Sequence, residues 1–307
     1  MLKNKHLFGL EGYPAEDIQK IINLGFTFRE VLERPIKKVP SLKGVTIVNL
    51  FFENSTRTKI SFDIAQKRLS ADTINFSASS SSLKKGESFK DTAQNIEAMK
   101  IDAVVMRHPT PGAPKHLSKF IDSVIINAGD GTHEHPTQAI LDMMSLYEKF
   151  GKLKGLKIGI IGDILHSRVA LSNIYGLKTM GAEITLCGPS NLIPQNITEL
   201  GVKYSKNVDE VIDWADAINV LRIQKERMGR GLVPSIREYR SFFGITVERL
   251  KHHNKEIVIM HPGPINRGVE IDSVVADSKQ AIILDQVLNG VASRMAILYL
   301  LCGGKST

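Results

Sequence analysis

The stretch that most constrains the fold is residues 44–69, which read as a strand, a short polar turn and a helix. Residues 44–52 are almost continuously apolar, as is typical of a parallel strand covered on both faces. Beyond the turn, one face of the helix carries Thr58, Phe62, Ala65 and Leu69. Ile60 and Ile64 fall on the other face, so we expect this helix to be well buried.

The start of this helix has the groups of an anion-binding site. Ser55, Thr56 and Thr58 supply hydroxyls, and Arg57 supplies a guanidinium. A helix N-terminus adds unpaired backbone N–H groups and a partial positive charge. An ordinary N-cap at Asn54 or Ser55 beside a solvated arginine is the alternative, and this run of residues taken alone favours neither.

The alternation of strand and helix continues along the chain and predicts an α/β fold. Further strands are expected near residues 73–76, 102–106, 123–128, 156–161, 183–187, 217–221 and 257–260. Helices are expected over residues 16–32, 91–100, 136–150, 207–213 and 285–301, and from about residues 114 and 167 onward. This pattern indicates mainly parallel sheets flanked by helices.

At 307 residues the chain is too long for one typical core, so we expect two domains. Residues 151–155 look like the boundary between them. The first domain would comprise residues 1–150, with a C-terminal helix at about 286–307 packing back on it. The second domain would comprise residues 151–285.

A distinctive polar group follows the carboxyl end of one expected strand after another. The groups are residues 55–58, Arg107, His135, Asp163 with Arg168, Arg222 with Gln224, and His261 with Pro262. Ligands of open parallel sheets bind outside these strand ends. The six groups therefore predict one active site in the cleft between the two domains, suited to anions and a polarised carbonyl. Taken singly, each has a simpler reading, such as a surface cation or a helix cap.

The composition argues against several other classes of partner. The net charge of +8 is spread over scattered lysines and arginines, and aromatic residues make up only 6%, so nucleic-acid binding is not expected. Cys187 and Cys302 form no disulfide framework, which favours a reducing cytoplasm. We expect no signal peptide and no membrane span, because no apolar run of about 18 residues occurs.

Metal and cofactor motifs are weak or missing. His133 and His135 flank Glu134, but no third ligand is evident, so we expect no metal. Gly159 and Gly162 hint at a dinucleotide turn, yet the glycine spacing of a nicotinamide site is absent. No phosphate-loop lysine motif and no serine-nucleophile elbow occur. We therefore expect no cofactor.

Seven segments spread over essentially the whole chain match a known pattern. They are FFENSTRTKISFDIA, SSSSLKKGES, VMRHP, NAGDGTHEHPTQAILD, GDILHSRVALSN, LRIQKER and MHPGPINRGVEID. The sequence resembles the aspartate/ornithine carbamoyltransferase family, and within it the catalytic chains of the aspartate branch. The ornithine branch carries His-Cys-Leu-Pro where this chain has His261-Pro262-Gly263-Pro264. The resemblance implies carbamoyl transfer from carbamoyl phosphate to L-aspartate, which gives N-carbamoyl-L-aspartate for pyrimidine synthesis.

The resemblance also implies a role for each site residue. The phosphate of carbamoyl phosphate would be held by Ser55, Thr56, Arg57 and Thr58. Its carbonyl oxygen would be contacted by Thr58, Arg107 and His135. Its NH₂ group would be received by Gln138 and the backbone carbonyls of Pro262 and Gly263. The aspartate carboxylates would be bound by Lys85, Arg168, Arg222 and Gln224.

Further expectations concern assembly. By the same resemblance, Ser81 and Lys85 reach into the neighbouring subunit's site, which implies a homotrimer with shared active sites. On composition alone, the serine-rich stretch that contains them predicts only a floppy surface loop. Glu53 would steady domain closure by pairing with an arginine across the cleft. A regulatory chain or a dihydroorotase is a possible further partner.

The chemistry that the resemblance implies is direct attack of the aspartate amine through a tetrahedral intermediate, because no obvious protein nucleophile is present. Two alternatives stay open at this point. The acceptor could be another amine, such as ornithine, or the chain could be a non-catalytic paralogue that scaffolds a pyrimidine-pathway complex.

Overall fold

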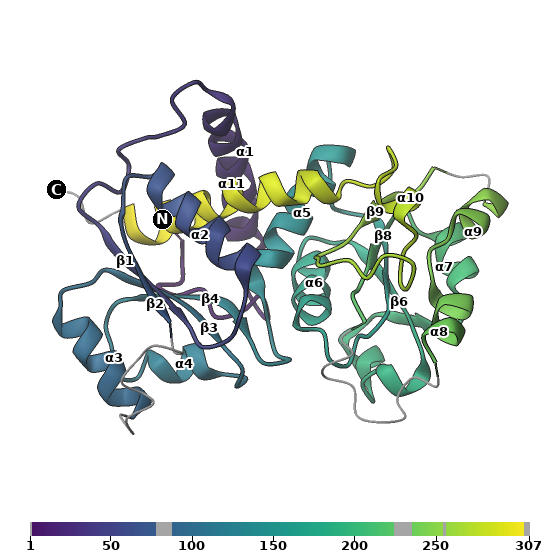
Figure 1. The fold of residues 1–307 in the computed structure, drawn as a ribbon, viewed down its shortest axis with the longest axis horizontal. Coiled ribbons are helices and arrows are strands. Elements are labelled where there is room, and N and C mark those ends of the chain that lie inside the picture. The colour runs from purple at the N-terminus through teal and green to yellow at the C-terminus, as the bar shows by residue number, and fades with distance from the viewer. Residues whose placement is uncertain (1, 78–87, 224–234, 254–255, 304–307) are drawn as a thin grey trace. The chain divides into compact units, whose positions relative to one another are not determined.

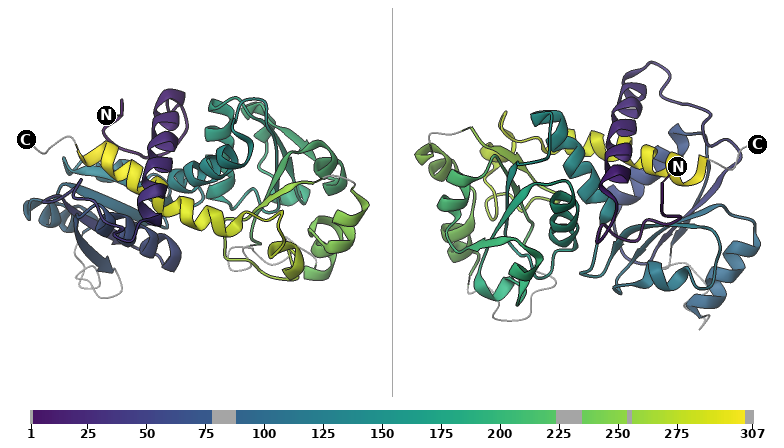
Figure 2. Two further views of the ribbon diagram at one scale, coloured as in Figure 1. Left: turned by 90° about the horizontal axis from the view of Figure 1, so that it is seen from above. Right: turned by 180° about the vertical axis from the view of Figure 1, so that it is seen from behind.

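The computed structural model describes residues 2–77, 88–223, 235–253 and 256–303. The chain divides into two compact units: unit 1 contains Met1–Met144 and Leu288–Thr307, and unit 2 contains Ser145–Val287. Each unit is built on one sheet flanked by helices, as Figures 1 and 2 show, which confirms the predicted α/β class. None of the helices in the described part of the chain has the length and apolarity needed to cross a membrane.

The sheet of unit 1 has four parallel strands in the order β2-β1-β3-β4. Their bounds are β1 (Thr46–Phe51), β2 (Asp72–Ser77), β3 (Ala103–His108) and β4 (Val124–Asp130). Every residue of β4, and all but the first of β1, is buried. The burial of β1 explains why it reads as an almost continuous apolar run, since a parallel strand in the sheet interior has both faces covered.

Helices cover both faces of this sheet (Figure 1). On one face, α3 (Phe89–Ala98) and α4 (Ala113–Leu117) pack against strand residues such as Leu50 and Met106. On the other face lies α2 (Thr56–Arg68), whose Gln66 exchanges two hydrogen bonds with Asn49 of β1, of 3.0 and 2.7 Å. Unit 1 also contains α1 (Ala15–Glu33), the first part of α5 (Pro136–Phe150) and most of α11 (Ile283–Cys302).

The sheet of unit 2 has five parallel strands in the order β7-β6-β5-β8-β9. Their bounds are β5 (Lys157–Ile161), β6 (Glu183–Cys187), β7 (Lys203–Ser205), β8 (Ala217–Val220) and β9 (Val258–Met260). The helices are α6 (Arg168–Thr179), α7 (Val208–Trp214), α8 (Ile236–Phe243), α9 (Val247–His252) and α10 (Ser273–Ala276), with short 3₁₀ turns at Ser190–Leu192 and Ile197–Leu200. In Figure 1, α6 covers one face and α7 the other, where Val211 and Ile212 of α7 join a core cluster with Ile218 of β8 and Ile259 of β9.

One sequence-based expectation about the helices is wrong. Helix α2 buries Phe62 and Ala65 as expected, but Ile60 is 52% exposed, so the helix is not buried on both faces within one chain. A second apolar face on a helix does not show whether residues of the same chain bury that face. The strand β7, the helices α8, α9 and α10, and the two 3₁₀ turns were not predicted.

Candidate active site

The predicted site residues gather at one edge of each sheet. In unit 1 the chain passes from β1 to β2 on one side and then to β3 on the other, so strand order reverses beside β1, where Phe51 pairs with Arg107. In unit 2 the reversal lies between β5 and β8, where Ile161 pairs with Val220. Crevices at such reversals are the usual ligand sites of open parallel sheets.

The loop after β1 leads directly into the N-terminus of α2. Ser55 occupies the N-cap position, yet its side chain makes no capping hydrogen bond. Ser55 is half-buried, Thr56 and Arg57 are exposed, and Thr58 is buried. The first N–H groups of a helix have no partner within the helix, and here the N-cap hydroxyl does not take one. This end of α2 can therefore offer backbone N–H groups, hydroxyls and a guanidinium to an anion.

Arg107, near the end of β3, is held in place by groups from both neighbouring strands. Its Nε lies 2.7 Å from Oε1 of Glu53, which follows β1, and its Nη1 donates a 3.0 Å hydrogen bond to the backbone carbonyl of Ala128 in β4. The Arg107 side chain is 12% exposed and that of Glu53 is 19% exposed. Glu53 was expected to pair with an arginine across the cleft, and the pair seen here lies within unit 1, so that expectation stays a prediction.

His135 and Gln138 lie at the start of α5. The backbone carbonyl of His135 accepts hydrogen bonds from the N–H groups of Gln138 and Ala139, at 2.9 and 3.3 Å, so His135 caps the helix with its backbone. The His135 side chain is 4% exposed. Gln138 is half-buried, and its Nε2 donates a 3.0 Å hydrogen bond to Oδ1 of Asp142.

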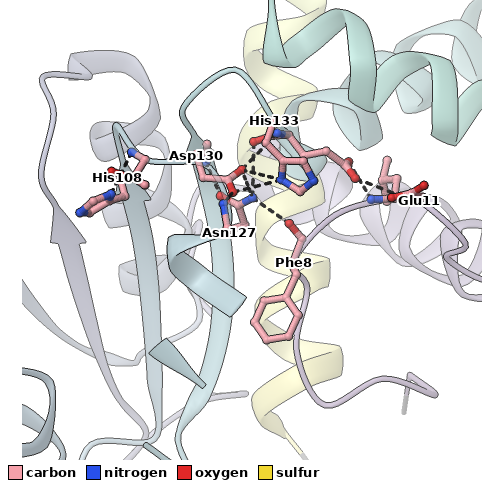
Figure 3. A network of polar contacts seen from close by, with 11 residues as sticks. Phe8, Glu11, His108, Asn127, Asp130 and His133 are labelled. Atoms are coloured by element: carbon pink, nitrogen blue, oxygen red, sulfur yellow. Dashed lines mark hydrogen bonds and ion pairs between the residues drawn. The ribbon is translucent and has the colours of Figure 1, made fainter. Parts of the chain in front are cut away.

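The loop that precedes His135 is braced by buried acidic groups, shown in Figure 3. Asp130 accepts hydrogen bonds from the Asn127 side chain at 2.8 Å and the Glu134 backbone N–H at 3.1 Å. The Glu134 carboxylate, in turn, accepts the backbone N–H groups of Leu10 at 2.7 Å and Glu11 at 3.2 Å. The N-terminal segment therefore anchors the loop that positions His135.

In unit 2, Arg168 is the first residue of α6 and is 5% exposed. The N-cap residue Ser167 accepts a hydrogen bond from the Ala170 N–H at 3.2 Å, which fixes the start of the helix. Just before it, the buried Asp163 lies 2.9 Å from Nδ1 of His166. These contacts hold the turn between β5 and α6 and so fix the backbone position of Arg168.

The chain at the end of β8 runs close to this turn. The Leu221 N–H donates to the Ile161 carbonyl at 2.8 Å. A side chain at Gly162, whose φ is +130°, would come within 3.1 Å of Leu221, so this close approach requires glycine. Half-buried Arg222 follows directly. The backbone of Arg168 and that of Arg222 therefore both follow the carboxyl ends of the neighbouring strands β5 and β8.

After β9, the residues 261–264 form a turn held by hydrogen bonds of the buried His261 and Glu270. His261 Nδ1 accepts the backbone N–H of Gly263 at 2.8 Å, and His261 Nε2 lies 3.3 Å from Oε1 of Glu270. The same Glu270 oxygen accepts the Asn266 backbone N–H at 2.6 Å. Pro262 and Gly263 are half-buried, and the buried side chains of His261 and Glu270 fix the backbone of this turn.

Both cysteines, Cys187 and Cys302, are buried. Burial raises the pKa of the Cys187 thiol to about 12, so this cysteine is a protonated thiol at neutral pH. Within the described ranges, no three His, Cys, Asp or Glu side chains gather in a way that could hold a metal ion.

Most predicted site residues lie in the described part of the chain. Unit 1 brings together the α2 N-terminus, Arg107 and Glu53, and unit 2 brings together Arg168 and Arg222 at one edge. Ser81, Lys85 and Gln224 lie outside the described residues. Sequence reasoning missed Asp142, although its spacing of four residues from Gln138 on an expected helix was a signal that the two side chains meet.

Both halves of the chain match known domains. Residues 5–148 match the carbamoyl-phosphate-binding domain of aspartate/ornithine carbamoyltransferases, and residues 154–301 match the aspartate/ornithine-binding domain. The aspartate carbamoyltransferase catalytic subunit of Cytophaga hutchinsonii is 60% identical over 304 residues, which cover 99% of each chain. That of Gemmatimonas aurantiaca is 58% identical over 301 residues, which cover 98% of this chain and 94% of that protein.

A solved structure gives the same result for the fold. The aspartate transcarbamoylase of Trypanosoma cruzi, crystallised with carbamoyl phosphate, superimposes with a TM-score of 0.89 at 30% identity, and the match covers 97% of this chain and 96% of that one. The resemblance predicted from the sequence motifs is therefore confirmed. This chain belongs to the aspartate/ornithine carbamoyltransferase family.

Proposed function

We propose that this chain transfers the carbamoyl group of carbamoyl phosphate to the amino group of L-aspartate, giving N-carbamoyl-L-aspartate and phosphate. The observation that carries the proposal is the α2 N-terminus, whose N-cap side chain makes no capping bond, beside the fixed guanidinium of Arg107. Relatives about 60% identical are named aspartate carbamoyltransferase catalytic subunits. The Trypanosoma cruzi enzyme has been solved with both carbamoyl phosphate and aspartate.

The phosphate of the donor is bound at the start of α2 in this proposal. Ser55, Thr56, Arg57 and Thr58 supply hydroxyls, a guanidinium and backbone N–H groups, and Ser81 and Lys85 add to them from a neighbouring subunit. The partial positive charge of a helix N-terminus stabilises the leaving phosphate as an anion.

The carbonyl carbon of the donor is the centre of the reaction. When the aspartate amine attacks it directly, its oxygen gains negative charge in a tetrahedral intermediate. Thr58, Arg107 and His135 act as the donors that stabilise this oxygen, and losing one such donor typically costs about 3–4 kcal/mol. Gln138 and the backbone carbonyls of Pro262 and Gly263 accept hydrogen bonds from the carbamoyl NH₂ group. Binding both substrates together contributes about 7–11 kcal/mol by removing the cost of bringing them into contact.

The aspartate carboxylates are bound by the guanidinium groups of unit 2. Arg168 and Arg222, at the reversal of strand order, are suited to two carboxylates, because a guanidinium binds a carboxylate through two parallel hydrogen bonds and an ammonium does not. Gln224 and Lys85 complete this part of the site in the proposal. Glu53 favours the closed state by pairing with an arginine of unit 2 once both substrates are bound.

The exposed apolar side chains of unit 1 support association with further chains, and we propose a trimer as the active form. Strand β2 lies at the edge of its sheet, and Ile74 of β2 and Ile60 of α2 are 47% and 52% exposed. Unpaired edges and apolar patches are surfaces that a second chain covers. We propose that the active sites are shared between neighbouring chains, that a regulatory chain or a dihydroorotase is a possible further partner, and that the enzyme acts in the cytoplasm.

An activity assay tests the proposed reaction. The purified chain is incubated with carbamoyl phosphate and a panel of amines that includes L-aspartate and L-ornithine, and the products are identified by mass. We expect N-carbamoyl-L-aspartate as the main product. A preference for ornithine would move the chain to the other branch of the family, and absence of turnover with every amine would support a non-catalytic scaffold.

A mixing experiment tests the shared site. Arg57→Ala and Lys85→Ala chains each have strongly reduced activity in the proposal, but a mixed trimer can contain one site with neither substitution. We expect partial activity after subunit exchange. No recovery, although exchange is demonstrated by mass, would contradict a site that is completed by a neighbouring chain.

A further inference from the structure

The side chain of Gln138 has one orientation that its surroundings permit. Its Nε2 donates a 3.0 Å hydrogen bond to Oδ1 of Asp142, one turn further along α5. Gln138 is half-buried, whereas Asp142 has no exposed surface. A carboxylate accepts hydrogen bonds and cannot donate them. The NH₂ group of Gln138 therefore faces Asp142, and its carbonyl oxygen Oε1 lies on the other side of the amide.

A buried cation, Arg294 of α11, attracts the Asp142 side chain. Arg294 is 4% exposed, and its Nη1 donates to Ser61 Oγ of α2 at 2.9 Å and to the Gly290 carbonyl at 3.0 Å. Burial lowers the pKa of Arg294 to about 10, and the attraction of Asp142 opposes that shift, so the guanidinium is charged at neutral pH. A facing cation favours the ionised form of a carboxylate.

The position of Arg294 is restricted by tight packing. Its guanidinium lies 5.1 Å from the ring centroid of Phe62 in α2. A side chain at Gly290 would come within 2.7 Å of Arg294 Nη1 and 3.1 Å of Leu141 in α5. Contacts from α2 and α11 therefore hold the guanidinium in place, and its charge attracts Asp142.

The carbamoyl group needs this orientation. Its NH₂ group can only donate, so the protein must present an acceptor. A glutamine amide that is free to rotate presents its own NH₂ group as readily as its oxygen, and two donors facing each other repel. When one N–H of the amide donates to a carboxylate, rotation of the amide is fixed, and its oxygen points away from the carboxylate.

We propose that Asp142 is a positioning residue, which fixes the Gln138 amide so that its oxygen accepts the carbamoyl NH₂. The site then selects a carbamoyl phosphate over an acyl phosphate that lacks the NH₂ group. This inference rests on the proposed function and adds the physical origin of its selectivity for the donor.

The experiment compares two donors that differ only at this group. Acetyl phosphate carries a methyl group where carbamoyl phosphate carries NH₂. Their dissociation constants are measured by calorimetry on the full-length protein without aspartate. In Asp142→Asn the new amide can donate to Oε1 of Gln138 and turn its NH₂ toward the substrate. We expect carbamoyl phosphate to bind roughly tenfold more weakly, while the affinity for acetyl phosphate changes by less than about twofold.

A rescue variant separates positioning from a general structural role. In Gln138→Glu/Asp142→Asn, the amide at residue 142 donates to the carboxylate at residue 138, which keeps an oxygen free to accept the carbamoyl NH₂. We expect the ratio of the two affinities to return toward the wild-type ratio, even if both donors bind more weakly beside the added negative charge. A ratio that stays as low as in Asp142→Asn would overturn the inference.

The remaining outcomes also decide the question. If both donors bind more weakly by the same factor in Asp142→Asn, the ratio of their affinities is unchanged, and Asp142 only supports the fold. If Asp142→Asn does not fold, Asp142→Ser decides in the same way, because a hydroxyl can donate or accept and no longer fixes the amide. Failure of the wild-type chain to carbamoylate aspartate would instead contradict the proposed function itself.

Discussion

Helices α2 and α6 both begin after a serine and carry an arginine in their first turn, yet the two helix starts are built differently. Ser167 caps α6 by accepting the Ala170 N–H, and Arg168 is buried. Ser55 makes no such bond at α2, and Arg57 is exposed. At α6 the backbone is satisfied by the protein and the side chain is the binding group. At α2 the backbone itself is available to an anion. A serine before a helix can thus be a structural cap or part of a ligand site.

The largest expected effect on catalysis is at Arg57, the exposed arginine of α2. Arg57→Ala should lower kcat/KM by about 10²–10³-fold, because a cation that stabilises the leaving phosphate is lost. The thermal midpoint should stay near that of the wild type, since Arg57 is exposed. Steady-state kinetics and thermal unfolding measure both. Lys67→Ala, which removes a cation from the far end of the same helix, is the matched control and should leave kcat/KM unchanged. Near-normal turnover of Arg57→Ala would remove α2 from the site.

The buried arginine of α6 should act on the second substrate only. Arg168→Lys keeps the charge but loses paired hydrogen bonds to a carboxylate, so we expect KM for aspartate to rise roughly 10- to 100-fold. The dissociation constant for carbamoyl phosphate should not change. Steady-state kinetics and calorimetry give the two values. Equal losses for both substrates would mean that Arg168 supports the fold of unit 2 rather than a carboxylate.

The two serines give the most direct comparison of the helix starts. Ser167→Ala should lower the free energy of unfolding by about 1 kcal/mol, because a helix cap is lost. Ser55→Ala should leave stability unchanged but weaken inhibition by inorganic phosphate about 3- to 10-fold, because a hydroxyl donor is lost. Thermal unfolding and phosphate inhibition are measured on both variants. If the two patterns were reversed, the assignment of cap and ligand group would be wrong.

The smallest expected effects concern pH and one histidine in each unit. Burial lowers the pKa of His108 below its ordinary 6.5, so its contribution to stability is present above that value and is lost as pH falls. Burial alone would also lower the pKa of His253, but hydrogen bonds and charges from Asp213 and Asp209 together raise it. Its contribution is therefore present below 6.5 and is lost as pH rises through the folded-state pKa.

Substitution by glutamine separates the two cases. The destabilisation caused by His253→Gln should be larger at about pH 5.5 than at about pH 8, and that caused by His108→Gln should be smaller at the lower pH. The differences should be below about 1 kcal/mol for His253, because both partner carboxylates are at least half exposed. Thermal midpoints at the two pH values measure them. The same trend in both variants would contradict the opposite pKa shifts.

The sequence predicted the elements that carry strong local signals. Helix α5 has the predicted bounds because Pro136 suits a first helical position and Gly151, with a φ of +71°, suits the position after the last. The strands β1 and β4 were recognisable because both faces are buried. Strand β7 contains only three residues and was missed, since its pairing with β6 supplies the order that its own sequence does not.

The candidate site was predicted as a set of strand ends, and its interior contacts were not. Parallel strands place their carboxyl ends at one edge, so the order of elements alone brought Arg107 near the loop after β1. The pairing of Arg107 with Glu53 and the position of Arg294 against Ser61 depend on three-dimensional packing between distant residues. No periodicity in a single sequence encodes such contacts, which join residues as far apart as 61 and 294.

The assignment of Leu288–Thr307 to unit 1 has a consequence for how this protein is made. A ribosome completes every residue of unit 2 before it reaches the last segment of unit 1, so the unit that is begun first is the last to have all its parts. Until Arg294 has been synthesised, Ser61 and Phe62 lack the guanidinium that contacts both. A nascent chain that stops at Val287 therefore holds a complete second unit and an unfinished first one.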